Sequence, residues 1–241
     1  IASGQNIVAW NWNAGGSSVT NTDGTISSQV RASTDAGFSI VSWTADGSSS
    51  NGIGHGLDET PTVIIYKRRS GAASGWYVWT TVIDGSNDLL LLNTTAVASA
   101  ITGYGSPTST TISNYGYPNT AEIIAYCFAG VDGFSKFGTY TGNGSADGPF
   151  VYTGFRPAFV IVKRTDNTGS WIMHDDKRNA YNVLNKEVYA NLLDAEATAV
   201  RYDFLANGLK VRNTFTNTNA SGGTYIYMAF AENPFKTARA R

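Results

Sequence analysis

Charge and cysteine are scarce in this sequence. Charged residues make up only 15% of the 241 residues, and the formal net charge is -1. Without a basic excess, the chain has no field that would draw it to nucleic acid. The single cysteine, Cys127, excludes an internal disulfide and lies in the apolar run IIAYCFA, where we expect a buried, unreactive thiol.

Long apolar runs are absent as well. The longest, LLLL at 89–92, has the length of a strand and falls far short of the roughly 18 residues that a membrane-spanning helix needs. Ser, Thr, Asn and 26 glycines fill most polar positions. Such a composition suits strands and tight turns better than the charged surfaces of helices.

Three stretches of the sequence repeat one another without gaps. They are NIVAWNW (6–12), EIIAYCF (122–128) and TYIYMAF (224–230). Between them, GFS (37–39) recurs at 133–135, and PTVIIYKR (61–68) recurs as PAFVIVKR (157–164). Matching order, spacing and residue type indicate an internal repeat.

The repeat predicts two domain-sized units of roughly 100 residues each. We place the first at residues 37–131 and the second at 132–241. Residues 1–36 read as the last strand of a preceding unit followed by a linker, so we expect further sequence before residue 1.

Nearly every segment has the pattern of a strand. The runs TVIIYKR, FVIVKR and WYVWTTVI are β-branched or aromatic, and Asn207-Gly208 predicts a hairpin between YDFLA and LKVR. Only residues 183–197 could hold a helical turn or two. We therefore predict an all-β chain of two β-sandwiches in tandem, with one large jelly-roll sandwich of two related halves as the alternative.

One aligned pair of positions supplies the candidate ligand-binding residues. Trp79 aligns with His174, and because that partner is polar, Trp79 is the best candidate for an exposed aromatic that stacks on a sugar. His174 precedes Asp175 and Asp176, a combination suited to metal or acid–base chemistry. The alternative, which the sequence favours, is an exposed strand end whose two aspartates pair with the two basic residues that follow.

Signals of catalysis are weak. His55 lies in a glycine-rich turn without a histidine counterpart in the second unit, so a turn role is favoured. No Ser-His-Asp order, phosphate loop or metal-spaced cluster occurs, and no pair of glutamates recurs between the units, as a glycosidase site in each copy would require. The sequence thus argues against an enzyme and calls for no cofactor or metal.

Four motifs resemble a known family: GFSIVSWTADG (37–47), GLDETPTVIIYKRR (56–69), the run KFGTYTGNGSADGPFVYTGFRPAFVIVKR (136–164) and GGTYIYMAFAENPF (222–235). They resemble a repeated domain of tailed-bacteriophage virion proteins, especially tail fibres of marine and cyanobacterial phages. That domain is similar to concanavalin-like lectin sandwiches. The resemblance covers nearly the whole chain and assigns no catalytic or sugar-contacting residue.

The resemblance implies an extracellular location on the virion, a homotrimer if the protein is a fibre, and contacts with other tail proteins. It implies binding to a host surface polysaccharide or receptor, while Ca²⁺ enters only by analogy with lectins. Two alternatives stay open: a purely structural spacer or decoration protein, and a polysaccharide depolymerase with two carboxylates in one cleft.

Overall fold

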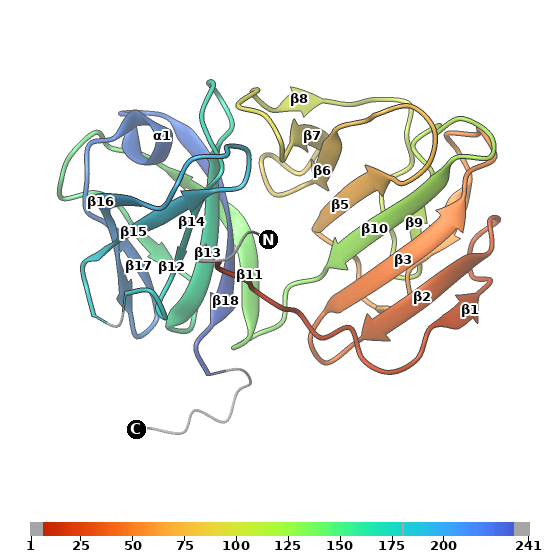
Figure 1. Ribbon diagram of the computed structural model, residues 1–241, viewed down its shortest axis with the longest axis horizontal. Helices are drawn as coiled ribbons and strands as arrows, with labels where there is room; N and C mark the ends of the chain where they lie inside the picture. The colour runs from red at the N-terminus through yellow and green to blue at the C-terminus, as the bar shows by residue number, and fades with distance from the viewer. Residues whose placement is uncertain (1–6, 180, 234–241) are drawn as a thin grey trace.

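The computed structural model describes residues 7–179 and 181–233 and consists almost entirely of antiparallel strands (Figure 1). The first eight-stranded sheet contains, in spatial order, β1 (Val19–Asn21), β2 (Ser28–Ser33), β3 (Phe38–Thr44), β10 (Glu122–Phe128), β5 (Val63–Arg68), β6 (Trp76–Thr80), β7 (Asp88–Leu91) and β8 (Ser99–Ala100). The second contains β11 (Ser135–Thr141), β18 (Thr224–Ala231), β13 (Pro157–Arg164), β14 (Ile172–Asp175), β15 (Leu184–Tyr189), β16 (Ala197–Leu205), β17 (Gly208–Val211) and β12 (Phe150–Tyr152). A two-stranded sheet of β4 (Gly52–Gly54) and β9 (Thr111–Ser113) and a single helical turn, α1 (Thr216–Asn219), complete the described elements.

The sequence repeat is also a repeat of strand pairing. In the first sheet β10 lies between β3 and β5, and in the second β18 lies between β11 and β13. Ile64 of β5 pairs with Trp79 of β6, and at the aligned positions Val160 of β13 pairs with His174 of β14. The two units therefore share a common strand arrangement as well as common motifs.

Each unit has a hydrophobic core of its own, which confirms the prediction of tandem sandwiches. In the first unit one face of the sheet packs against β4 and β9, and the largest side chains of this core are Trp43, Tyr66 and Trp79. In the second unit the sheet curls so that β12 and β17 lie opposite β13 and β18, with Tyr202 and Tyr225 between them.

A third apolar core joins the units through the opposite faces of the two sheets. Because side chains alternate along a strand, Ile64 enters the first core while Val63 joins the third. Trp12 lies between the sheets, and its ring centroid is 5.6 Å from that of Phe159 and 5.3 Å from that of Phe230. The two units thus pack as successive layers of one molecule (Figure 1).

Hydrogen bonds reinforce this contact between the units. The indole Nε1 of Trp171 donates to the carbonyl of Leu91 at 2.9 Å, and the amide of Ala98 donates to the carbonyl of Thr165 at 2.9 Å. Lys163 is fully buried and donates to the carbonyls of its neighbour Arg164 and, across the contact, of Thr95. Burial lowers the pKa of this lysine to about 8.

Two expectations about elements need correction, and one holds. Over residues 7–12 the segment expected as a strand of a preceding unit forms no strand, and its tryptophans pack into the third core instead. The boundary expected at residue 37 separates β2 from β3, which pair in one sheet. Residues 183–197, the one segment that could have held a helical turn or two, contain no helix: Leu184–Tyr189 is strand β15, which pairs with both β14 and β16. The hairpin at Asn207-Gly208 is confirmed, since β16 pairs with β17 across it.

Candidate functional site: a polar cleft where the second sheet fails to close

The expected exposure of Trp79 is wrong. The side chain is 1% exposed and belongs to the core of the first unit. Side chains alternate along its strand, so that Trp79 and Tyr77 face the first core and Val78 faces the third. A ring enclosed by its own core offers no face on which a sugar could stack.

His174 and Asp175 are also buried, so the strand end expected at the surface lies inside the second unit. The imidazole of His174 stands edge-on to the ring of Tyr202, with a centroid distance of 5.2 Å, and its Nε2 is 3.9 Å from a carboxylate oxygen of Glu187. Burial lowers the pKa of His174 to about 4. The imidazole is therefore neutral at physiological pH.

The aspartates make the ion pairs that the sequence suggested. A carboxylate oxygen of Asp175 lies 2.6 Å from Nε of Arg178, and its other oxygen accepts the backbone amides of Lys177 and Arg178. Asp176 lies 3.3 Å from Nζ of Lys177 and 3.7 Å from Nη1 of Arg156. These contacts hold the β14 terminus in shape.

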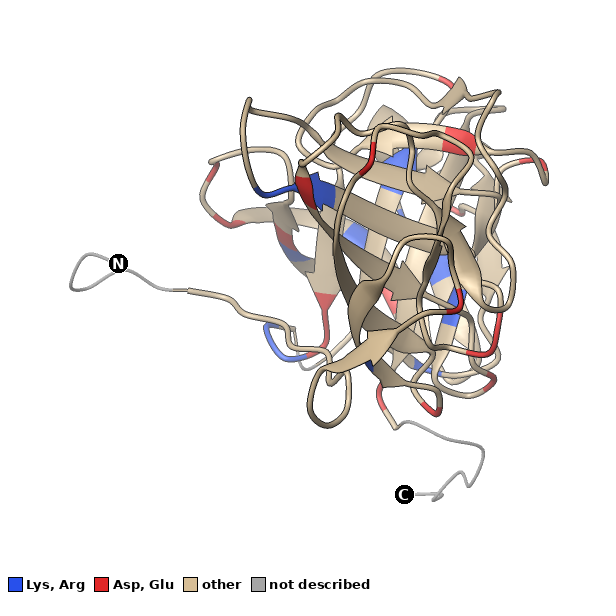
Figure 2. Cartoon of the chain, turned by 90° about the vertical axis from the view of Figure 1, so that its right-hand side faces the viewer, with Lys and Arg blue, Asp and Glu red and all other residues tan. Residues whose placement is uncertain are grey.

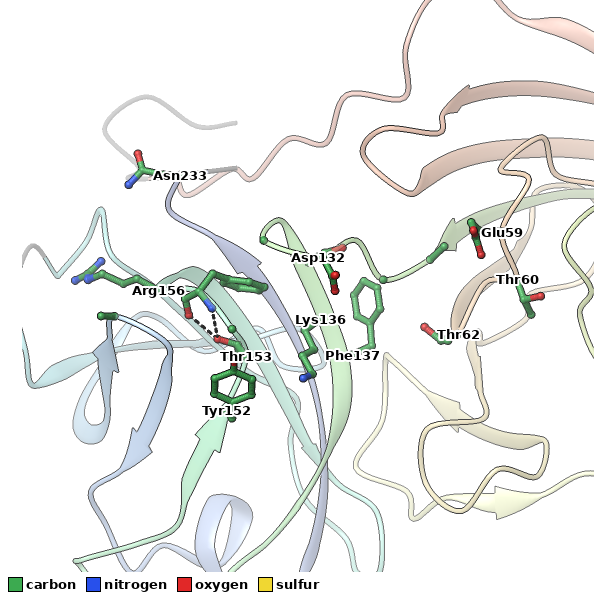
Figure 3. Close-up of a pocket in the computed structure, with 17 residues that line it drawn as sticks. Glu59, Thr60, Thr62, Asp132, Lys136, Phe137, Tyr152, Thr153, Arg156 and Asn233 are labelled. Carbon is green, nitrogen blue, oxygen red and sulfur yellow. Dashed lines mark hydrogen bonds between the residues drawn. The ribbon is translucent and has the colours of Figure 1, made fainter. Parts of the chain in front are cut away.

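A large polar cleft lies elsewhere, at the junction of the two units (Figure 3). Its volume is about 770 Å³. The first unit contributes the loop before β5, with Glu59, Thr60 and Thr62, and the turn between β10 and β11 contributes Asp132. The second unit contributes residues of both its edge strands, β11 and β12, and the loop that follows β12.

The cleft lies where the second unit lacks a connection that the first unit has. In the first unit, the segment between β1 and β2 reaches β4: Ile26 bridges to Ile53, and the Ser28 hydroxyl donates to the carbonyl of Gly54 at 2.8 Å. The second sheet begins at β11 and has no strands in the places of β1 and β2. Its edges, β11 and β12, are left facing one another without pairing.

One pair of side chains spans this gap. The ammonium of Lys136, on β11, lies 5.1 Å from the ring centroid of Tyr152, on β12 (Figure 3). A cation above an aromatic face is attracted by the quadrupole of the ring. Among the described residues Lys136 forms no ion pair, so its charge stays available to a ligand in the cleft.

Aromatic side chains on β12 are exposed to a degree that is unusual for an edge strand. Phe150 is 45% and Tyr152 is 58% exposed, whereas Val151 between them is buried in the core. Natural edge strands generally avoid large exposed apolar side chains because such edges invite aggregation. In the first unit the corresponding strand, β4, has glycines on either side of its buried Ile53. The exposed pair is therefore a feature of the second unit alone.

The wall beside Tyr152 is held by internal bonds. The Thr153 hydroxyl donates to the carbonyl of Phe155 at 2.5 Å. Arg156 donates to the carboxylate of Glu232 at 3.0 Å and lies near Asp176. Gly154 adopts a φ of +87°, a conformation that costs glycine little, and so turns the chain directly after the aromatic strand.

Charged residues of both signs occur on the side of the molecule that faces the viewer in Figure 2. Figure 2 shows acidic residues mostly on loops of the first unit, interspersed with basic ones, and no face dominated by one sign on the side in view. Among residues 7–179 and 181–233, no group of three His, Cys, Asp or Glu side chains is placed to hold a metal ion. No helix in the same residues is long and apolar enough to cross a membrane.

Comparison with known families gives one match: residues 2–234 fit the model of a domain of unknown function, DUF7483. The chain belongs to this family. The DUF7483 match spans both units and the segment that carries Trp12, in agreement with the apolar core that these parts share. No curated protein and no solved structure matches the chain.

Proposed function

We propose that this protein is a non-enzymatic bacteriophage virion protein, a tail-fibre component that binds a glycan of the host cell surface in the polar cleft. One observation carries the proposal: the exposed ring of Tyr152 lies beside the ammonium of Lys136, which forms no ion pair with the described residues, in a cleft of about 770 Å³. The resemblance of the motifs to phage virion domains supports a location on the virion, and the DUF7483 family, a domain of unknown function, assigns no role of its own.

The chemistry of the cleft suits a saccharide. The apolar face of a sugar ring can stack on Tyr152, while the Lys136 ammonium can donate to its hydroxyls and the Thr60 hydroxyl can donate or accept. A single exposed aromatic gives modest affinity. In a homotrimeric fibre, as the resemblance implies, several such sites would act together and raise the avidity.

The test is binding of the chain to an array of purified bacterial surface polysaccharides. Replacing Tyr152 by alanine should weaken binding about tenfold, the equivalent of about 1.4 kcal/mol, which is within the range of aromatic contacts. Tyr181→Ala is the matched control, because Tyr181 is 86% exposed and lies outside the cleft lining. Equal affinity of Tyr152→Ala and the parent would refute the cleft as the site, and no binding to any polysaccharide would favour a purely structural virion role.

A depolymerase is the second candidate, because the same cleft contains two carboxylates, Glu59 and Asp132 (Figure 3). Hydrolysis of a glycosidic bond needs an acid and a base or nucleophile on opposite sides of that bond. Release of new reducing ends from a bound polysaccharide, abolished in Glu59→Gln or Asp132→Asn, would establish the enzyme. Saturable binding without such release would support the adhesin.

A further inference from the structure

A second, apolar cleft lies between the two units, where their facing sheets separate. Its volume is about 400 Å³. Four of the six tryptophans of the chain contribute to its lining, and none of the described residues that line it is charged. They are Trp10, Trp12, Trp76 and Trp171. The cleft is distinct from the polar one and shares no lining residue with it.

The cleft is the incompletely filled end of the third core. In β3 and β5, Phe38 and Val63 are buried, whereas Ile40 and Ile65, two residues further along the same faces, are only half-buried. Likewise in β10, Phe128 is buried, whereas Tyr126 is only half-buried. Apolar side chains thus line an open, wedge-shaped cleft. A ligand that covered these side chains would remove apolar surface from water, which is favourable.

The opposite wall of the wedge is adaptable. Met173 of the second unit is half-buried and, with Met228, faces the row of side chains from the first unit. Unbranched thioether side chains rearrange easily around apolar ligands of different shape. A volume of this size also falls within the roughly 300–1,000 Å³ of small-molecule sites.

Two cations stand beside this apolar lining, Arg178 and Lys67. The Arg178 guanidinium lies 5.6 Å from the ring centroid of Trp10 but forms ion pairs with Asp175 and Glu196. Lys67 follows Ile65 on the same face of β5, and its ammonium lies 5.4 Å from the ring centroid of Trp76. It donates to the carbonyl of Ser74 at 2.6 Å and forms no ion pair within the described part of the chain. Its counterpart in the second unit, Lys163, is instead fully buried between the units. Only the first unit therefore presents a lysine at the mouth of the wedge.

We propose that this cleft binds a linear amphipathic anion of the fatty-acid class. The aliphatic chain lies between Ile40 and Ile65 on one side and Met173 on the other. The carboxylate lies at the mouth and pairs with Lys67. Because Arg178 is already paired with carboxylates and Lys67 forms no ion pair with the described residues, charge complementarity at Lys67 selects this class over neutral or cationic amphiphiles. The inference is independent of glycan binding in the polar cleft.

Quenching of tryptophan fluorescence tests the proposal, with a medium-chain fatty acid brominated at its terminal carbon, below its micellar concentration, as the probe. Bromine quenches indoles that it touches, so saturable quenching is expected. Unbrominated fatty acid should reverse the quenching, while an alkyltrimethylammonium of equal chain length should compete poorly. Absence of saturable quenching, or equal competition by the cationic amphiphile, would overturn the proposal.

Variants locate the site. Lys67→Gln should weaken binding of the fatty acid about two- to fivefold, as expected for a partly exposed ion pair. Ile40→Glu places a carboxylate in the half-buried wall and should abolish binding, whereas Val19→Glu, at an exposed position on β1, should not. A melting temperature close to that of the parent shows that each variant is folded. Unchanged quenching in folded Ile40→Glu, or unchanged affinity in Lys67→Gln, would contradict the assignment.

Discussion

Protonation of His174 should destabilise the protein in mildly acidic solution. Burial lowers the pKa of this imidazole to about 4 in the folded chain, from 6.5 in the unfolded one. Burial is the largest cause, and Arg201 and Arg178 lower the pKa further. The nearby Glu187 carboxylate raises the pKa but does not offset the effect of burial. The fold therefore holds the neutral ring, and the unfolded chain takes up the proton first as the pH falls.

The sign and size of the effect follow from this difference. Above about pH 6.5 both states are neutral at His174, and its contribution to stability is fully present. Between about pH 6.5 and about pH 4 the unfolded state binds more protons, so the free energy of unfolding decreases by about 1.4 kcal/mol per pH unit. The total loss from this residue is about 3 kcal/mol, and below about pH 4 it stops growing.

Urea unfolding at about pH 7 and about pH 4.5 measures the effect. His174→Phe is the informative variant, since its aligned residue in the first unit is the apolar, buried Trp79. Carboxylates that titrate in this range contribute equally to parent and variant, so the difference between the two chains isolates the imidazole. The variant should lose about 2–3 kcal/mol less than the parent between these pH values. An equal loss in both chains would refute the reasoning.

Three further predictions concern packing and buried polar groups. Asn219→Ala should destabilise the second unit by about 2–3 kcal/mol, because the buried side-chain amide of Asn219 donates hydrogen bonds to Asn143, Ser145 and Asn213. Thermal unfolding measures the loss of stability. A loss no larger than that caused by Asn167→Ala, at an exposed position, would contradict the prediction. Trp12→Ala should lower the free energy of unfolding by about 3–5 kcal/mol and loosen the contact between the units, since Trp12 packs against both sheets. Calorimetry should then show a broadened or split unfolding transition. An unchanged transition would count against the shared core. Burial raises the pKa of Cys127 to about 12, so the thiol should react with a maleimide only at the rate of unfolding.

The repeat was the most informative signal in the sequence, because it reflects strand pairing that both units keep. Aligned positions such as Trp79 and His174 do occupy equivalent places in the two sheets. The inference from a polar partner to an exposed aromatic failed for a physical reason. A neutral histidine packed against Tyr202 can fill a core position that a tryptophan fills in the other unit.

The cleft could not be found by the same comparison, because it depends on what the units do not share. The segment around Ile26 that contacts β4 lies in residues 1–36, which the sequence predicts to be the end of a preceding unit and a linker, so the repeat does not reveal that this segment closes the first unit. One available signal was the alternation in FVY (150–152), which exposes two aromatics where GIG (52–54) exposes none. Recognising it requires knowledge that these short segments are corresponding edge strands.

The third core limits how recombination can rearrange the units of such a chain during evolution. Each unit buries one face of its sheet against the other unit, so the two units cannot be gained or lost independently of one another. A recombination event that gained or lost one copy alone would leave a broad face of Phe, Ile and Met side chains in water, with the aggregation hazard this brings. Genetic exchange that preserves solubility should therefore move both copies and their tryptophan-bearing lead segment as one block.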